Sequence, residues 1–250
     1  MIKHIIFSLL ISFIVLNPFN TKVLSNNIKP SDPHSHQAWT KLLQKHVTDE
    51  GHVDYRGFIK DKDQLLDYTK KLSQNPPAEN WTENEKKAYL INTYNAFTVL
   101  LIVNNYPLES IKDIGGFLSG PFSKKFIKLG KETYSLNDVE KGMLLEMGDA
   151  RAHFAVNCAS YSCPKLENKA FIPSQLDQQL DQASRNFLRS DKNKISESSL
   201  QLSKIFKWYS SDFENYSGSV INFINNYTDK EISSDANIEH LDYNWSLNEK

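Results

Sequence analysis

The sequence predicts a single-domain α+β protein in which helices outnumber strands. Residues 88–103 are apolar on nearly every side, which is typical of a helix buried in a protein core. Two short strand signals, a hairpin at 125–134 and a β-type run at 152–157, do not alternate regularly with the helices. Regular alternation would favour a doubly wound sheet, so we expect a long buried central helix with a small mixed or antiparallel sheet and surrounding helices.

Before the central helix, the apolar spacing over residues 57–72 predicts another helix. Thr82 and Glu85 then form a capping box at the start of the central helix, because each side chain can hydrogen-bond the other's backbone. Pro107 bounds its far end. The apolar part has only 16 residues and is interrupted by polar side chains, so we place this helix in a protein core and not in lipid.

After the hairpin, which should turn at Gly130, Ser135 predicts a helix start with Asp138 near the positive end of the helix dipole. Residues 174–188 carry apolar side chains at spacings of four, three and four, as in an amphipathic helix. Two shorter helices are expected at 201–209 and 220–227. Residues 240–247 are rich in aromatic and aliphatic side chains, so we expect them to dock on the core.

The N-terminus has the features of a secretory signal peptide over residues 1–25. A short polar start precedes 12 residues that are apolar except for two serines, and small residues approach a cleavage point at Ser25. Twelve residues are fewer than the roughly 20 that a spanning helix needs, although an uncleaved anchor is the alternative. We therefore expect an exported protein, periplasmic or secreted in a bacterial envelope, with no stable membrane span after cleavage. Residues 26–37 should form a mobile leader and 38–250 one globular domain.

The composition excludes several classes of protein. Hydrophobic residues make up 40% of the 250 residues and charged residues 24%, which is typical of a globular domain. The chain has 29 Lys and Arg against 30 Asp and Glu, so no basic excess favours a nucleic-acid partner. Two cysteines are too few for a disulfide-dense scaffold or a four-thiolate zinc site. We predict no cofactor.

Two amides lie in the central helix. Asn92 and Asn95 are three residues apart on one face, with Tyr94 between them. A buried amide left unpaired costs roughly 1–3 kcal/mol, so these side chains must find partners. One interpretation is that they hold the backbone of an irregular loop, for which the glycine-rich residues 115–121 are the candidate. The other is that they belong to a binding site together with Tyr94.

Most of the chemically versatile residues gather in residues 151–164. This segment holds both cysteines, a histidine, an arginine and three hydroxyl side chains within 14 positions. We therefore expect a functional cleft beside it.

A nucleophilic thiol is the first interpretation. Cys158 lies where a short strand gives way to small residues, and a helical turn from Ala159 would lower the thiol pKa through its amide dipoles. In a strand, however, His153 and Asn157 share one face, roughly 13 Å apart, while Cys158 points away. His52 and His240 then remain as candidate bases, unless the chain turns after Asn157.

A disulfide between Cys158 and Cys163 is the second interpretation, because two lone cysteines in an oxidising compartment usually pair. Such a small loop would contribute about 2 kcal/mol. The spacing of His153 and the two cysteines matches no standard tetrahedral pattern, so no metal site is predicted. His153 with Asn157 could instead line a polar pocket, or His153 could be a buried histidine that bonds a backbone carbonyl.

Several segments together resemble the family called domain of unknown function 547, which is found in exported bacterial proteins and, fused to other regions, in plants and nematodes. The most specific is Asn-Cys-Ala-Ser-x-Ser-Cys-Pro, and the resemblance covers nearly the whole mature chain, with a core at about 82–190. Ala150 departs from the family's usual proline. The plant relatives look intracellular, which weighs against a structural disulfide. The segments that carry the resemblance are residues 51–55, 88–98, 135–140, 153–164 and 242–248.

The resemblance implies no established reaction, substrate or cofactor, but it does imply which residues belong to the family's pattern. They are Asn92, Tyr94, Asn95, His153, Asn157, Cys158, Ser160, Ser162, Cys163 and Pro164.

Our leading hypothesis is a binding module for a small molecule or peptide in the cell envelope. The alternative is a cysteine-dependent hydrolase or acyl transferase with Cys158 as nucleophile and His153 as the candidate base. Binding residues are expected to be Asn92, Tyr94, Asn95, Arg151, Asn157, Ser160 and Ser162.

Overall fold

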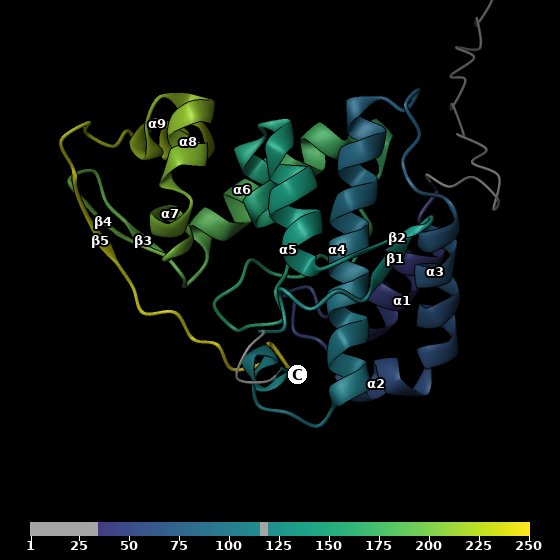
Figure 1. Cartoon of the computed structure of the whole chain (residues 1–250). Helices are drawn as coiled ribbons and strands as arrows, with labels where there is room; N and C mark the ends of the chain where they lie inside the picture. The colour runs from purple at the N-terminus through teal and green to yellow at the C-terminus, as the bar shows by residue number, and fades with distance from the viewer. Residues whose placement is uncertain (1–34, 116–119) are drawn as a thin grey trace, which may run out of the picture.

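The structure is a computed structural model that describes residues 35–115 and 120–250 (Figure 1). The expected signal peptide and most of the expected leader lie outside these residues. The last positions assigned to the leader are structured, because Ser35 and His36 are buried and helix α1 begins at Gln37. Among the described helices, none combines the length and the apolar character needed to cross a bilayer.

The α+β class and the buried central helix are confirmed. Helix α4 (Glu83–Asn105) runs through the middle of the molecule, and every side chain from Ala88 to Val103 is buried. The capping box is present: the Thr82 hydroxyl accepts a hydrogen bond from the Glu85 amide, and the Glu85 carboxylate accepts one from the Thr82 amide at 2.7 Å. Local capping and burial on every side therefore agree in defining this helix.

Three helices cover one side of α4: α1 (Gln37–His46), α2 (Tyr55–Lys60) and α3 (Lys62–Gln74). The single helix expected at 57–72 is wrong, since the chain leaves helical geometry at Asp61. The carboxylate of Asp61 accepts hydrogen bonds from Lys45 and His46, both at 2.6 Å, which ties the break to α1. A tertiary contact thus divides a continuous helical pattern.

The hairpin expected at 125–134 is confirmed as strands β1 (Ile127–Leu129) and β2 (Glu132–Tyr134), which pair antiparallel with Gly130 at the turn. Ser135 caps α5 (Leu136–Val139) with Asp138, also as expected. The helix continues as a π turn over Glu140–Leu144 and a 3₁₀ turn over Leu145–Met147. The π turn places Glu140 beside the cavity described below.

A second core lies on the other side of the molecule. Phe154 packs against the rings of Phe187, Phe206, Phe213 and Phe223. The amphipathic helix expected at 174–188 is confirmed as α6, preceded by a short 3₁₀ turn. The elements of this region are the 3₁₀ turn Pro173–Gln175, α6 (Leu176–Arg189), α7 (Ile205–Trp208), α8 (Ser210–Ser217) and α9 (Val220–Tyr227).

The second core is edged by a mixed sheet of β3 (Lys194–Ile195), β4 (Ser199–Leu202) and β5 (Asn237–His240). Strand β4 pairs antiparallel with β3 and parallel with β5. The helix expected at 201–209 is therefore wrong in its first half, because Leu200 and Leu202 alternate with exposed or half-buried residues, as in a strand.

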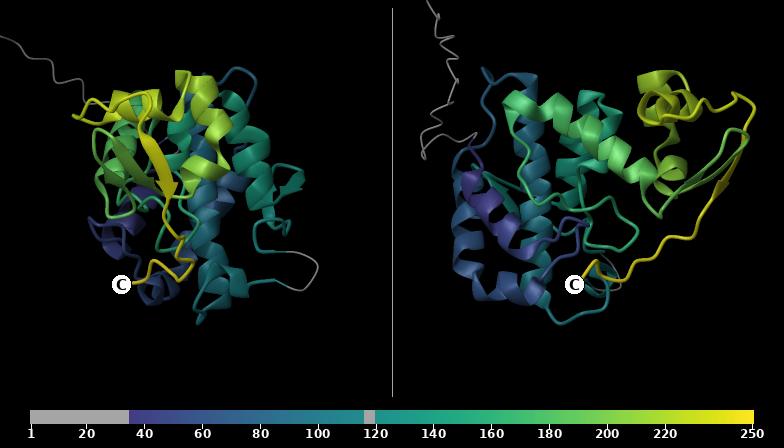
Figure 2. Two further views of the ribbon diagram at one scale, coloured as in Figure 1. Left: turned by 90° about the vertical axis from the view of Figure 1, so that its left-hand side faces the viewer. Right: turned by 180° about the vertical axis from the view of Figure 1, so that it is seen from behind.

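After β5 the chain runs back across the molecule toward α2 (Figure 2). We call residues 241–250 the C-terminal strap. Its residues Ser246, Leu247 and Glu249 form bridges with Ser110, Ser160 and Val53, three positions far apart in the sequence. The expected docking of the C-terminus on the core is confirmed, and it brings the strap against the segment that holds both cysteines.

Candidate functional site

The strand expected at 152–157 is wrong. Residues Ala150–Phe154 form a 3₁₀ helix, η4, whose start is capped by Asp149, since its carboxylate accepts a hydrogen bond from the Arg151 amide. Asp149 therefore begins a helical turn where the apolar alternation suggested a strand. His153 and Asn157 consequently do not share a strand face.

The chain turns sharply after Asn157. Ala159 adopts the left-handed conformation, with a φ of 61°, which is uncommon for a residue with a side chain. The side chain of Asn157 holds the turn. Its Oδ1 accepts a hydrogen bond from the backbone N–H of Ala159 at 2.9 Å, and its Nδ2 donates to the backbone carbonyl of Pro164 at 2.7 Å. The helical turn expected from Ala159 is absent, so helix dipoles do not act on the thiol.

Hydrogen-bond donors surround the sulfur of Cys158 instead. Ser160 Oγ lies 3.1 Å and Tyr243 Oη 3.4 Å from Cys158 Sγ. Burial raises the pKa of Cys158, but the hydrogen bonds from Cys163, Ser160 and Tyr243 outweigh this and lower it to about 7. The loop and the strap together therefore stabilise a thiolate at this position.

Cys163 lies directly beside Cys158. Its sulfur accepts the backbone N–H of Cys158 at 2.9 Å. Burial and the neighbouring Cys158 raise the pKa of Cys163 well above its ordinary value. Both cysteines are free in the structure, so the expected disulfide is not shown.

Both sulfurs lie on the wall of a cavity of about 430 Å³, which we call the thiol cavity. Aromatic rings form much of its wall, and Trp208, Tyr243 and Trp245 pack on one another with centroids 4.6–6.0 Å apart. The polar groups on the wall are few, as in ligand pockets generally. The remaining lining residues are Tyr94, Phe122, Asn137, Glu140, Lys141, His153, Val156, Pro164, Ile205 and Tyr209.

His153 lies on the same wall but is paired with another residue. Its Nε2 lies 2.8 Å from Asp212 Oδ2, and its ring packs on Tyr209 with centroids 4.1 Å apart. The hydrogen bond from His153 lowers the pKa of Asp212. Among the described residues no hydrogen bond joins His153 to Cys158, so the structure brings the imidazole and the thiol to one cavity without pairing them.

The other two candidate bases are not on this cavity. His52 lines a second, polar cavity of about 300 Å³, on which Cys163 also lies. His240 is on strand β5 and lines neither cavity. Within the described parts of the chain, no group of three or more ligating side chains is arranged to hold a metal ion.

The central-helix amides bond backbone groups, as one interpretation expected. Asn92 bonds both backbone groups of Phe171, and Asn95 bonds the Ala155 carbonyl at 2.9 Å and the Asn157 amide at 2.8 Å. Of the loop expected as their partner, residues 115–121, positions 116–119 lie outside the described residues. Asn95 fixes the chain that leads to Cys158, while Tyr94 lines the thiol cavity.

The remaining predicted residues of the loop hold the C-terminal strap. The Ser162 hydroxyl accepts the Asn244 amide at 2.9 Å, and Asn157 accepts from the Asn248 side chain at 3.2 Å. Asn248 in turn accepts from the Tyr55 hydroxyl, which is why residues 51–55 belong to the same assembly. Ser160 bonds both the strap and the thiol.

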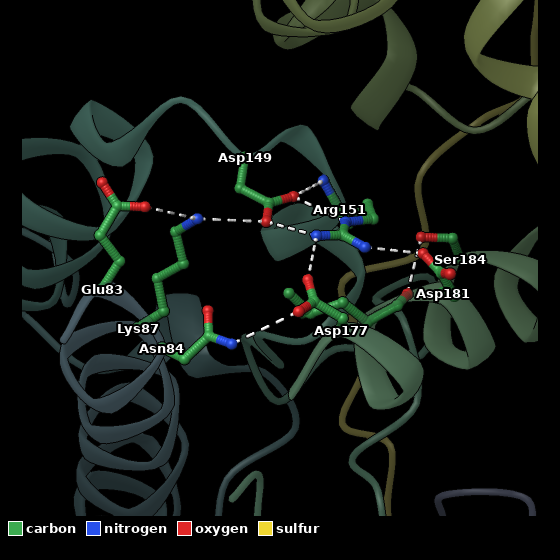
Figure 3. Close-up of polar contacts among 9 residues, drawn as sticks. Glu83, Asn84, Lys87, Asp149, Arg151, Asp177, Asp181 and Ser184 are labelled. Atoms are coloured by element: carbon green, nitrogen blue, oxygen red, sulfur yellow. Dashed lines mark hydrogen bonds and ion pairs between the residues drawn. The ribbon is translucent and has the colours of Figure 1, made fainter. Parts of the chain in front are cut away.

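Arg151 lines neither cavity. Figure 3 shows it among the carboxylates of Asp149, Asp177 and Asp181. Its guanidinium donates to the carboxylates of Asp149, Asp177 and Asp181 at 2.7–2.9 Å. Lys87 adds an ion pair to Asp149 at 3.4 Å. This Arg151 network joins α4, η4 and α6, so Arg151 acts here as a structural residue.

Sequence reasoning missed Tyr243, Asp212, Tyr209 and Glu140. Tyr243 lies in the segment 242–248 that carried part of the resemblance, which is the signal that could have included it. Asp212 and Glu140 gave no local signal, because their partners His153 and Tyr209 are 59 and 69 residues away.

Comparison with known proteins gives one result. No curated protein and no solved structure matches the chain. Residues 78–188 match a family profile, and this range runs from just before α4 almost to the end of α6, with the cysteine loop inside it. Tyr243 and Asp212 lie outside the matched range. The expected resemblance is therefore confirmed: over residues 78–188 the chain resembles the family described as "Protein of unknown function, DUF547".

Proposed function

We propose that the thiol cavity binds a small molecule or a short peptide and that Cys158 attacks what binds there, as in a cysteine-dependent acyl transferase or hydrolase. The observation that carries this proposal is Cys158, which lines the cavity and whose sulfur contacts the hydroxyl groups of Ser160 and Tyr243. An anion stabilised by donors at the wall of a ligand-sized cavity is the arrangement that a nucleophile needs.

The cavity supports the binding part of the proposal. Its volume of about 430 Å³ lies within the range of about 300–1,000 Å³ that is usual for ligand pockets. Its aromatic wall offers flat apolar surface, and Asn137, Glu140 and Lys141 offer a few polar contacts that could orient a ligand.

The pKa of Cys158 supports the nucleophilic part. At a pKa of about 7, roughly half of the thiol is ionised at neutral pH without a base. Attack on an acyl carbon would expel the leaving group and leave a thioester on Cys158, which water or a second acceptor would then cleave. His153, which is oriented by Asp212 and lines the same cavity, would transfer the proton to the leaving group.

We place this activity in the cell envelope, because the first 25 residues have the features of an export signal. N-terminal sequencing of envelope material is expected to return a chain that starts near Asn26. A chain that starts at Met1 would contradict cleavage.

The test measures the pH dependence of iodoacetamide labelling at Cys158 in the reduced protein. We expect a midpoint near 7 in the wild type, and the same midpoint in His153→Asn, because no hydrogen bond joins the two side chains. We also expect a phenylacetyl thioester to acylate the wild type at Cys158 but not the Cys158→Ser variant. Mass spectrometry detects the adduct.

A midpoint near the ordinary thiol value of about 8.5 would overturn the nucleophile. A midpoint that rises in His153→Asn would contradict the independence of the two groups. A second candidate function, binding without chemistry, is favoured because no hydrogen bond joins His153 to Cys158 in the described part of the chain. It would be supported if the thioester protected Cys158 from iodoacetamide without acylating it.

A further inference from the structure

We infer that Cys158 and Cys163 form a dithiol pair for thiol–disulfide exchange, with Cys158 attacking the disulfide of an apolar peptide and Cys163 releasing it. This inference rests on the nucleophile proposed above and names its electrophile, a sulfur atom in place of an acyl carbon.

The position of the second thiol carries the inference. An acyl-transfer nucleophile needs no neighbouring cysteine, yet the Cys163 sulfur accepts the backbone N–H of Cys158 at 2.9 Å. Both side chains lie on the wall of the thiol cavity. A mixed disulfide formed on Cys158 would therefore have a second thiol at its side.

Cys158 is more exposed than Cys163, as the order of the two attacks requires. Cys158 is half-buried and reachable from the cavity, whereas Cys163 is 6% exposed. The first attack must reach an external sulfur, and the second attack is intramolecular. The lowered pKa of Cys158 and the raised pKa of Cys163 agree with this order, because the group that attacks first should be the thiolate.

Each step conserves atoms and electrons. The Cys158 thiolate attacks one sulfur of the substrate, which forms a mixed disulfide and expels the other sulfur as a thiolate. Cys163 gives its proton to that thiolate and attacks the Cys158 sulfur, which forms the Cys158–Cys163 disulfide and releases the second half of the substrate. The peptide disulfide is the oxidant, and it is reduced by two electrons while the protein is oxidised by two.

Cys163 also lines the second cavity. This polar cavity of about 300 Å³ is lined by Cys163 together with His52, Lys165 and Lys192. The two cysteines thus lie between an aromatic cavity and a polar one. We assign the substrate to the aromatic cavity, because Cys158 lines the aromatic cavity and not the polar one.

The wall of the thiol cavity selects the class of disulfide. Trp208, Tyr209, Tyr243 and Trp245 favour aromatic or aliphatic side chains, and Glu140 and Lys141 together add no net charge. We therefore expect a disulfide-bonded peptide with apolar neighbours to react faster than a charged, low-molecular-weight disulfide.

The experiment uses a peptide disulfide with Phe beside each half-cystine, a matched peptide with Gly in place of Phe, and oxidised glutathione. Three reduced proteins are compared: the wild type, Cys158→Ser and Cys163→Ser. Serine at position 163 keeps an oxygen that can accept the Cys158 N–H, so this variant retains the loop. Quenched samples are analysed by mass spectrometry.

The wild type is expected to release both halves of the Phe peptide and to end with an internal disulfide. Cys163→Ser should retain one half as a mixed disulfide on Cys158, and Cys158→Ser should react at least tenfold more slowly. The Phe peptide should react several-fold faster than the other two disulfides. Equal rates for all three disulfides would overturn the assignment of an apolar peptide.

Other outcomes separate the two proposals. A wild type that retains the mixed disulfide as long as Cys163→Ser does would overturn exchange and leave the nucleophile of the proposed function in place. Reaction of Cys158 no faster than in the urea-unfolded protein would overturn both.

Discussion

Two polar clusters are built around Arg151, within η4, and Cys158, just after it, and they differ in how their polar groups are used. In the Arg151 network each charge meets an opposite charge: Arg151 bonds three carboxylates, and Lys87 pairs with Asp149. Around Cys158, hydroxyl groups lie against a sulfur on a residue that lines a cavity. Polar residues of one short segment can therefore have opposite roles, and what separates them is whether an opposite charge is present to pair with.

The Arg151 network should carry the largest stability effect. In Arg151→Met the Asp149 carboxylate, with only 5% of its side chain exposed, loses its main partner. Breaking a buried ion pair costs about 3–5 kcal/mol, so we expect a loss of that size in urea unfolding. The midpoint of Cys158 labelling should not move. Arg189→Met is the control, because Arg189 and Asp229 form an exposed pair that contributes about 0–1 kcal/mol.

The support beneath the thiol loop should come next. Asn95→Leu leaves the Ala155 carbonyl and the Asn157 amide without their partner. Each buried unpaired group costs about 1–3 kcal/mol, and we expect a total loss of about 2–4 kcal/mol in urea unfolding. Unlike Arg151→Met, this change should also alter the labelling midpoint of Cys158. Asn105→Leu, at the exposed end of α4, is the control. Equal effects of the two asparagine changes would contradict the role given to Asn95.

The donor from the C-terminal strap should affect reactivity more than stability. Tyr243→Phe removes the hydroxyl that lies 3.4 Å from Cys158 Sγ. A hydrogen bond to a charged group contributes about 1.5–3 kcal/mol, so the labelling midpoint of Cys158 should rise from about 7 by roughly one pH unit. Tyr161→Phe is the matched control, because the hydroxyl of Tyr161 bonds Asp191 and not Cys158. An unchanged midpoint in Tyr243→Phe would contradict the role of the C-terminal strap in lowering the pKa of Cys158.

The smallest effect should appear at acid pH. Burial raises the pKa of Asp149, but Arg151 and Lys87 lower it below the ordinary value, and His153 lowers that of Asp212. A carboxyl whose folded pKa is lowered stabilises the fold above its unfolded pKa of about 3.9, and this stability is lost as the pH falls through the folded value. In Asp149→Asn and in Asp212→Asn, the free energy of unfolding measured in urea should decrease less as the pH falls than it does in the wild type. The difference from the wild type should be greater for Asp149, which is less exposed than Asp212.

Sequence reasoning succeeded where neighbours along the chain decide the structure. The Thr82 capping box, the Gly130 hairpin and the apolar face of α6 depend on residues within one or two turns, so their patterns are visible in the sequence. It failed where a distant contact or a cap overrides a local pattern, as at Asp61 and at residues 152–157.

The candidate site shows the same limit. The cysteine loop was recognised from its composition, because nucleophiles and hydroxyls cluster there. The donor Tyr243 and the His153 partner Asp212 lie 85 and 59 residues from the groups they contact, and spacing in sequence carries no information about such distances. The three carboxylate partners of Arg151 are recognisable only once α6 packs on η4, so its ion pairs could not be predicted from the sequence.

The C-terminal strap has a consequence for the order in which the thiol site is assembled. During synthesis the two cysteines are made about eighty residues before Tyr243, which completes the set of groups around Cys158. A nascent chain would therefore lack one of the hydrogen bonds that lower the pKa of Cys158, and the pKa would reach its final value only when the strap docks. The fold thus delays completion of the thiol site until the domain that encloses it has been assembled.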